Sequence, residues 1–263
     1  MPDVSLVSPL PGDASVPNMP NLSDGATTMT TTTIFTGIVD IHHDDGAYDL
    51  DDVVAGGVAA MWVKNSEGVT FMDPSFVQAM DRARAAGLMR GAYHFARGTS
   101  GAEAQADAYA DDVRALYDYL GGEDVLTCLD LEGDPRNQRT MSTDDAARFL
   151  VRAHERLGRW PVLYMGLSKG RSRVRKASAE VRAILARCPL WLAAYGPDPL
   201  SLDGLGLWPS WSLQQYTNGS AGPRDRVRYP RETKGFFRAR QDRSAFRGSV
   251  EELRVWWQTA GRS

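Results

Sequence analysis

The sequence lacks the features that mark several broad classes of protein. Only two of its 263 residues are cysteines, Cys128 and Cys188, and they form neither a metal-binding motif nor a disulfide framework. We interpret both as small buried apolar residues and leave a bond between them open. The longest nearly unbroken apolar run, residues 53–63, is shorter than the roughly 20 residues that cross a membrane. The chain start has no basic segment followed by an apolar core, so no signal peptide is expected and synthesis is expected in the cytoplasm.

Basic residues are missing from the first part of the chain. Nine aspartates precede the first Lys or Arg, Lys64, and the whole chain carries a net charge of −3. This balance argues against nucleic acid as a partner, and no membrane partner is expected either. Residues 1–33 contain 17 Pro, Ser, Thr or Gly and too few apolar side chains to offset the entropy of ordering. We predict a flexible arm at 1–33, which either has no role or orders on a partner, followed by one domain at 34–263.

The remainder of the chain alternates short apolar segments with helical patterns. The apolar segments, predicted to be buried strands, are residues 35–43, 59–68, 88–97, 124–133, 160–167, 189–196 and 210–217. Helices are predicted at residues 74–86, 102–120, 143–157, 177–187 and 250–259. Five strand–helix units in this length favour an α/β barrel of parallel strands over an open sheet. No helix is predicted between residues 196 and 250, so strands alone should close the barrel.

Two carboxylates stand at the end of one predicted strand, in the run Leu129–Asp130–Leu131–Glu132. Side chains two apart on a strand face the same way, with Cβ atoms roughly 6–7 Å apart. In a cleft of low dielectric one of them keeps its proton while the other is charged. Cleavage of a glycosidic bond uses this arrangement, a proton donor beside a negative group. The alternative is a helix-capping Asp followed by a solvated Glu.

Two further aspartates extend this pair. Asp40 ends the first strand, and Asp242 lies near the last one. Asp40 could instead form a turn, and Asp242 could form a surface ion pair with Arg240 or Arg243. If the barrel closes as predicted, Asp40 and Asp242 lie on adjacent strands near its mouth. Like charges are costly to collect, so four acids at one rim indicate a functional site.

Several motifs in order give the chain a family resemblance. They are Gly37–His43, Val63–Gly68, Asp73–Phe76, Gly91–Phe95, Leu129–Glu132, Leu163–Tyr164, Leu190–Tyr195, Gln215–Thr217 and Asp242–Phe246. Over about residues 34–250 the sequence resembles the glycoside hydrolase family 25 lysozymes, Chalaropsis-type N-acetylmuramidases common in bacteria and bacteriophages. The chain departs from the pattern at Asp44, where an aromatic residue is usual, and at Asn65–Ser66, which replace Ala–Thr.

The resemblance implies an irregular TIM-like (β/α)5(β)3 barrel that cleaves the β-1,4 bond between N-acetylmuramic acid and N-acetylglucosamine in peptidoglycan, without a cofactor. Glu132 would donate the proton, and Asp130 would stabilise positive charge on the sugar or on an oxazolinium. Asp40 and Asp242 would shape the electrostatics and hold the substrate. Six residues are predicted to bind substrate: Glu67, Tyr93, Tyr164, Trp191, Tyr195 and Gln215. Each aromatic residue, Tyr216 included, could equally be a packing residue of the core.

Three other features are weaker candidates. His94 is expected to be buried and hydrogen-bonded. No metal site is predicted at His42 and His43, since adjacent strand residues point to opposite faces and no third ligand shows the right spacing. The basic stretches 169–176 and 224–243 are interpreted as solvated loops, with attraction to anionic wall polymers as the functional alternative and nucleic-acid binding as a weaker one.

Three hypotheses for the whole chain follow. The first is an active lysozyme associated with a phage, which acts on the cell wall after release or as part of a particle. A virion or lysis-system partner would then contact the arm at 1–33. The second is a structural virion component that uses the same barrel for wall binding with little or no catalysis. A glycosidase acting on another polymer, such as chitin, is a third reading.

Overall fold

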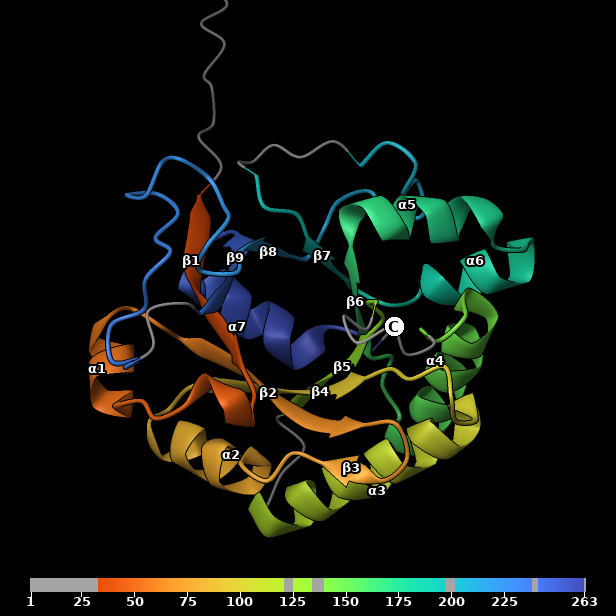
Figure 1. Ribbon diagram of the computed structural model, residues 1–263, viewed down its shortest axis with the longest axis horizontal. Helices are drawn as coiled ribbons and strands as arrows, with labels where there is room; N and C mark the ends of the chain where they lie inside the picture. The colour runs from red at the N-terminus through yellow and green to blue at the C-terminus, as the bar shows by residue number, and fades with distance from the viewer. Residues whose placement is uncertain (1–32, 121–124, 134–139, 197–201, 238–240, 263) are drawn as a thin grey trace, which may run out of the picture. The chain divides into compact units, whose positions relative to one another are not determined.

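The chain forms a closed barrel of strands in the computed structural model (Figure 1). The structure describes residues 33–120, 125–133, 140–196, 202–237 and 241–262. The predicted arm therefore lies outside the described residues, Thr33 excepted. Within the described part of the chain, no helix combines the length and the apolar character that a bilayer crossing requires.

Eight strands close the barrel in the order β1-β9-β8-β7-β6-β5-β4-β2, and β2 pairs back with β1. Their bounds are β1 Ile34–Ile41, β2 Ala60–Glu67, β4 Met89–Phe95, β5 Val125–Asp130, β6 Val162–Gly166, β7 Leu190–Ala193, β8 Leu213–Thr217 and β9 Asp242–Arg247. Neighbours are parallel except that β9 runs antiparallel to both β1 and β8. A short strand, β3 (Phe71–Met72), pairs with the end of β2.

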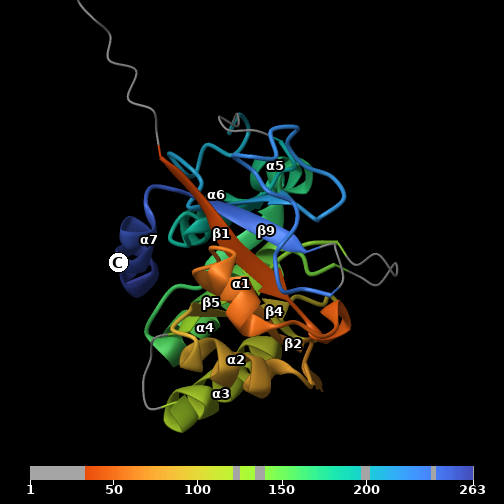
Figure 2. The same cartoon turned by 90° about the vertical axis from the view of Figure 1, so that its left-hand side faces the viewer.

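Helices lie outside the strands (Figures 1 and 2). Their bounds are α1 Leu50–Ala55, α2 Phe76–Ala85, α3 Ala102–Leu120, α4 Thr143–Leu157, α5 Leu167–Lys176, α6 Ala179–Leu185 and α7 Val250–Thr259. Among the described residues, no helix separates β7, β8 and β9. Five strand–helix units followed by three strands confirm the predicted (β/α)5(β)3 architecture.

Two helices were not expected from the sequence. The stretch 169–176, interpreted as a loop, is most of α5, because Lys and Arg are good helix formers and the chain enters the helix directly from β6. Its N-cap is Gly166, which offers no side-chain cap and therefore no start signal. The other, α1, is six residues long and is capped by Asp49, whose side chain accepts a hydrogen bond from the amide of Asp52.

The strand alternation divides the apolar residues into two clusters. One fills the barrel and includes Trp62, Cys128 and Trp191; the other lies between strands and helices and includes Cys188. Both cysteines are free. From α7, Trp257 enters the inner cluster, where its ring is tilted against that of Trp62 at 5.0 Å, and it donates a hydrogen bond to the carbonyl of Arg90. Because α7 fills the end at which β4 begins, the opposite end of the barrel is the one available to a ligand.

Gly91 provides a test of this inner packing. It lies against the indole of Trp62, and a Cβ atom there would overlap Trp62 Cε3. Trp62 is fully buried between Trp191, on which it stacks, and Trp257, whose ring is tilted against it, so a shift of its indole is costly. We expect Gly91→Ala to lower the free energy of unfolding by about 1–3 kcal/mol, measured by denaturant titration.

Gly206→Ala is the matched control, because a Cβ atom at Gly206 meets nothing within 4 Å. Its effect should stay within about 0.5 kcal/mol. Equal losses in the two variants would contradict the packing of Gly91 on Trp62.

Candidate active site

A cavity of about 310 Å³ opens at the end of the barrel opposite α7. Its walls carry the four predicted carboxylates and five of the six predicted substrate-binding residues, which are Glu67, Tyr93, Tyr164, Trp191 and Gln215. Four more lining residues were not predicted: His42, Asp45, Lys64 and Phe95. Tyr195 lies beside the cavity, half exposed, with its hydroxyl 3.4 Å from Gln215 Oε1.

Strand alternation explains why the acids meet. On β5, Leu126 and Cys128 face the barrel interior, so Asp130 at the end of the strand faces the cavity. On β1, Ile38 faces the barrel interior, so Asp40, two residues later, also faces the cavity. Since β9 is antiparallel, its first residue rather than its last lies at the mouth, and Asp242 pairs directly with Asp40.

Gln215 on β8 connects two of these acids. Its Nε2 lies 3.3 and 3.2 Å from the two carboxylate oxygens of Asp40 and 3.3 Å from Asp242 Oδ2. The hydroxyl of Tyr164 donates to Gln215 Oε1 at 2.9 Å, which fixes the amide with its NH2 group toward the acids. One neutral side chain thus donates hydrogen bonds to both carboxylates.

On the other side of the cavity, Glu67 is held by two cations. Its Oε2 accepts a hydrogen bond from Lys64 Nζ at 2.6 Å, and its Oε1 accepts one from Arg97 Nε at 2.8 Å. Burial raises the pKa of Glu67, but these hydrogen bonds outweigh it and hold the pKa below the usual value. Glu67 is therefore a charged residue in an ion-pair cluster, and it keeps the ammonium group of Lys64 at the cavity wall.

Burial raises the pKa of all four predicted carboxyl groups. For Asp130, burial and the charge of Glu132 raise the pKa well above its usual range. Burial raises the pKa of Glu132 too, against the opposing charges of Lys169 and Lys64. Among the described residues, none offers a hydrogen bond to Asp130 Oδ1. The pair at the end of β5 therefore holds a proton at a pH where solvated carboxyl groups have lost theirs.

The Asp40–Asp242 pair behaves similarly. Burial and the charge of Asp242 raise the pKa of Asp40 well above its usual range, although the hydrogen bond from Gln215 lowers it. Burial, with smaller contributions from Asp45 and Glu132, raises the pKa of Asp242 to about 7.

The aromatic residues have different roles. The indole of Trp191 lines the cavity, donates from Nε1 to Ser244 Oγ at 2.9 Å, and stacks 5.0 Å from Trp62. Tyr216 is fully buried and donates its hydroxyl to the carbonyl of Pro230, so it packs in the core and does not line the cavity.

His94 is buried, as predicted. Its ring nitrogens lie 2.9 Å from Ser66 Oγ and 3.1 Å from Gln105 Oε1, and burial lowers the pKa of its ring to about 4.

Some site residues could have been found from the sequence and others could not. Lys64 and Phe95 continue the inward rows of Trp62 and Tyr93, so the same alternation identifies them. Lys169 gives no such signal: it lies on the unpredicted helix α5, and its Nζ packs against Gly133, next to Glu132.

The prediction that His42 and His43 point to opposite faces of one strand was wrong. The strand β1 ends at Ile41, and His43–Asp45 form a 3₁₀ turn, η1. The two histidines are therefore not neighbours on one strand, and with Asp44 they could hold a metal ion, because one ligand atom of each lies within 4.8 Å of the others.

Comparison with known proteins places the chain in a family. The sequence profile of glycosyl hydrolases family 25 matches residues 39–223. The chain belongs to this family. The matched segment ends before Asp242, which the structure brings to the cavity through the pairing of β9 with β1.

Two curated relatives of this family 25 chain are lysozymes. Lysozyme M1 of Streptomyces globisporus is 28% identical over 208 residues, which are 73% of this chain and 66% of that protein. The autolytic lysozyme of Clostridium acetobutylicum is 24% identical over 190 residues, 71% of this chain and 53% of that protein. The chain thus spans less than two thirds of the length of these relatives.

Solved structures agree with the fold. The bacterial lysozyme of Streptomyces coelicolor superposes with a TM-score of 0.67 at 25% identity, covering 88% of this chain and 99% of that one. The family 25 lysozyme of Aspergillus fumigatus gives a TM-score of 0.62 at 24% identity, covering 85% of this chain and 98% of that one, and shows the same fold.

The raised pKa of Asp242 predicts a gain of stability on removing its charge. The folded-state pKa of about 7 exceeds the usual value of 3.8, so the protonated form of Asp242 favours the folded state. This stabilisation is lost as the pH rises from about 4 to 7. Asp242→Asn cannot ionise. We expect it to be more stable than the parent at pH 8 by on the order of 2–4 kcal/mol, at about 1.4 kcal/mol per pKa unit.

Urea unfolding at pH 4 and at pH 8 measures this difference. The gain should be much smaller at pH 4, where Asp242 is protonated in the folded state and roughly half protonated in the unfolded state. A gain of equal size at both values would show that the charge is not its cause.

Proposed function

We propose that the chain is a lysozyme that hydrolyses the β-1,4 bond between N-acetylmuramic acid and N-acetylglucosamine in peptidoglycan. The observation that carries this proposal is the pair Asp130 and Glu132, which shares an enclosed cavity and whose pKa values are raised by burial. Membership of family 25 and similarity to the two lysozymes support the choice of substrate.

In this proposal Glu132 is the general acid. Burial raises its pKa and so favours the protonated form, and the leaving oxygen of the scissile bond takes that proton as the bond breaks. Asp130 lies two residues earlier and provides negative charge beside the sugar. Positive charge that develops on the sugar, or on an oxazolinium from its acetamido group, favours the ionised form of Asp130.

The other walls of the cavity orient the sugar. Tyr93, Tyr164 and Trp191 present an aromatic surface of the kind on which sugar faces stack. A polar cluster lies beside them, formed by Asp40, Asp242 and the amide of Gln215. It can accept hydrogen bonds from sugar hydroxyls and donate hydrogen bonds to them.

Where the enzyme acts stays a prediction from the sequence. A virion or lysis-system partner that contacts residues 1–33, and action on the wall after release or within a particle, remain predictions. The reaction product distinguishes peptidoglycan from any other polymer as the substrate.

Glu132→Gln tests the general acid. The amide cannot donate a proton to the leaving oxygen, so release of reducing ends from purified peptidoglycan should fall by roughly 10²–10⁴-fold. Circular dichroism should show an unchanged fold, and Glu180→Gln, on the exposed surface of α6, should keep full activity.

Mass spectrometry of the parent's digest completes the test. Muramic acid at the new reducing end supports the proposal, whereas glucosamine there would assign the enzyme another specificity. Full activity of Glu132→Gln would refute the role of Glu132 in any glycosidase reaction.

Lys169 predicts a change in pH dependence. Its positive charge is the largest influence that lowers the pKa of Glu132. Lys169→Met should therefore raise that pKa and keep Glu132 protonated to higher pH, so the basic limb of kcat/KM against pH should move upward.

The matched control is Lys176→Met, which removes the same charge at the far end of α5. An identical pH profile in the parent and in Lys169→Met would show that Lys169 does not act on the acid.

A further inference from the structure

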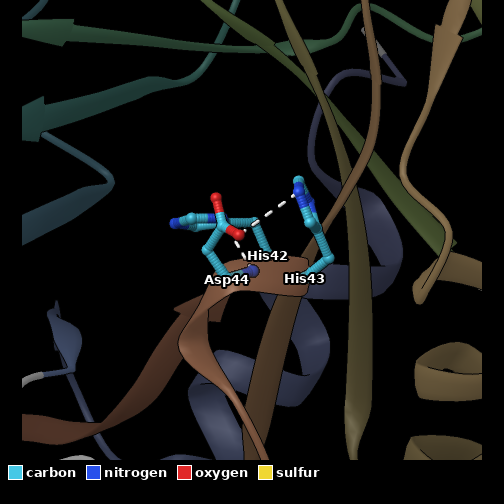
Figure 3. Close-up of side chains that lie close together, drawn as sticks. All are labelled: His42, His43 and Asp44. Atoms are coloured by element: carbon cyan, nitrogen blue, oxygen red, sulfur yellow. Dashed lines mark hydrogen bonds and ion pairs between the residues drawn. The ribbon is translucent and has the colours of Figure 1, made fainter.

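The turn that follows β1 gathers three side chains that can bind a metal ion (Figure 3). It is closed by hydrogen bonds from the amide of His42 to Asp45 Oδ2, at 2.7 Å, and from the amide of Asp44 to His42 Nδ1, at 3.3 Å. Because the backbone has left strand geometry, the rings of His42 and His43 lie only 5.7 Å apart. The carboxylate of Asp44 lies between the two rings (Figure 3).

We propose that His42, His43 and Asp44 bind a divalent transition metal ion of the zinc type. His43 Nε2 lies 3.4 Å from Asp44 Oδ1, and His42 Nδ1 lies 3.9 Å from Asp44 Oδ2. Zinc ligands at about 2.0–2.2 Å from a tetrahedral ion are roughly 3.3–3.6 Å from one another. Small rotations of exposed side chains bring the three donors to that spacing.

Asp73 prepares His43 for this role. Its side chain is fully buried, and its Oδ2 accepts hydrogen bonds from His43 Nδ1 at 2.8 Å and from the backbone amide of His43 at 3.1 Å. The hydrogen on Nδ1 leaves the lone pair of a neutral ring on Nε2, which faces Asp44. Histidines that bind metals are commonly held by a carboxylate in this way, with the second nitrogen fixed toward the ion.

A cation would stabilise this arrangement. The lone pair on His43 Nε2 and a carboxylate oxygen of Asp44 lie 3.4 Å apart, and positive charge between them attracts both. A proton on His43 would satisfy that pair alone, whereas a metal ion would also bind the lone pair of His42 Nδ1, in place of the 3.3 Å hydrogen bond that this atom accepts from the amide of Asp44.

The donor types select the metal. Two imidazoles and one carboxylate suit zinc, nickel, cobalt and copper, whereas calcium and magnesium prefer oxygen ligands alone. The side chains of His42 and Asp44 are 41% and 73% exposed, so the ion keeps positions open to water. His42 also lines the cavity of the four carboxylates, which places the ion at the rim of that cavity.

Calorimetry on the full-length chain tests this site independently of any enzymatic activity. The chain, without a histidine tag and treated with a chelator, is titrated with zinc chloride in a non-chelating buffer at pH 7.5. We expect one zinc ion per chain and loss of that binding in His42→Gln and in His43→Gln. With cobalt in place of zinc, the parent should show a visible absorption band that both variants lack.

Two further variants sharpen the result. Asp73→Asn removes the carboxylate behind His43 and should weaken zinc binding by roughly 10–100-fold, with thermal melting used to confirm that the variant is folded. His154→Gln removes a histidine on α4, outside the cluster, and should bind zinc like the parent.

Absence of zinc binding in the parent would overturn the proposal. Equal binding by the parent, His42→Gln and His43→Gln would overturn it as well, since the ion would then lie elsewhere on the chain.

Discussion

Repulsion among four carboxyl groups in one enclosed cavity is the constraint to which the rest of the site responds. Asp40, Asp130, Glu132 and Asp242 come from β1, from the end of β5 and from β9, so the barrel itself brings them together. Each has its pKa raised, with burial as the largest cause. The free energy needed to hold them comes from the packed apolar clusters inside and outside the barrel.

Different groups reduce this repulsion on the two sides of the cavity. Beside β8, Gln215 offers hydrogen bonds to Asp40 and Asp242 but no charge, so Asp242 keeps a pKa of about 7. Beside β2 and α5, Lys64 and Lys169 supply positive charge near Glu132. An amide on one side and ammonium groups on the other keep the two carboxyl pairs in different electrostatic surroundings, which is how one site can contain both proton donors and charged groups.

Much of this could be predicted from the sequence, because a strand has a period of two and the barrel closes on itself. That Asp130 and Glu132 face the same way follows from the alternation of side chains along a strand. That Asp40 approaches Asp242 follows from the pairing of the first and last strands. The hydrogen bonds of Gln215 could not be predicted, since they depend on where three separate strands meet. Lys169 was missed because the N-cap of its helix, Gly166, has no side chain that could signal a helix start.

The turn after β1 shows why a rule that is correct for strands fails at their ends. Alternation places Asp40 inward and would send His43 to the outer face, but the 3₁₀ turn begins at His43 and rotates the following residues. As a result Asp45 joins His42 on the cavity wall, and its charge raises the pKa of both Asp40 and Asp242. A local change of backbone geometry therefore extends the acidic surface beyond the sheet. The same change brings the imidazoles of His42 and His43, which the sequence predicted to point to opposite faces, together with a carboxylate.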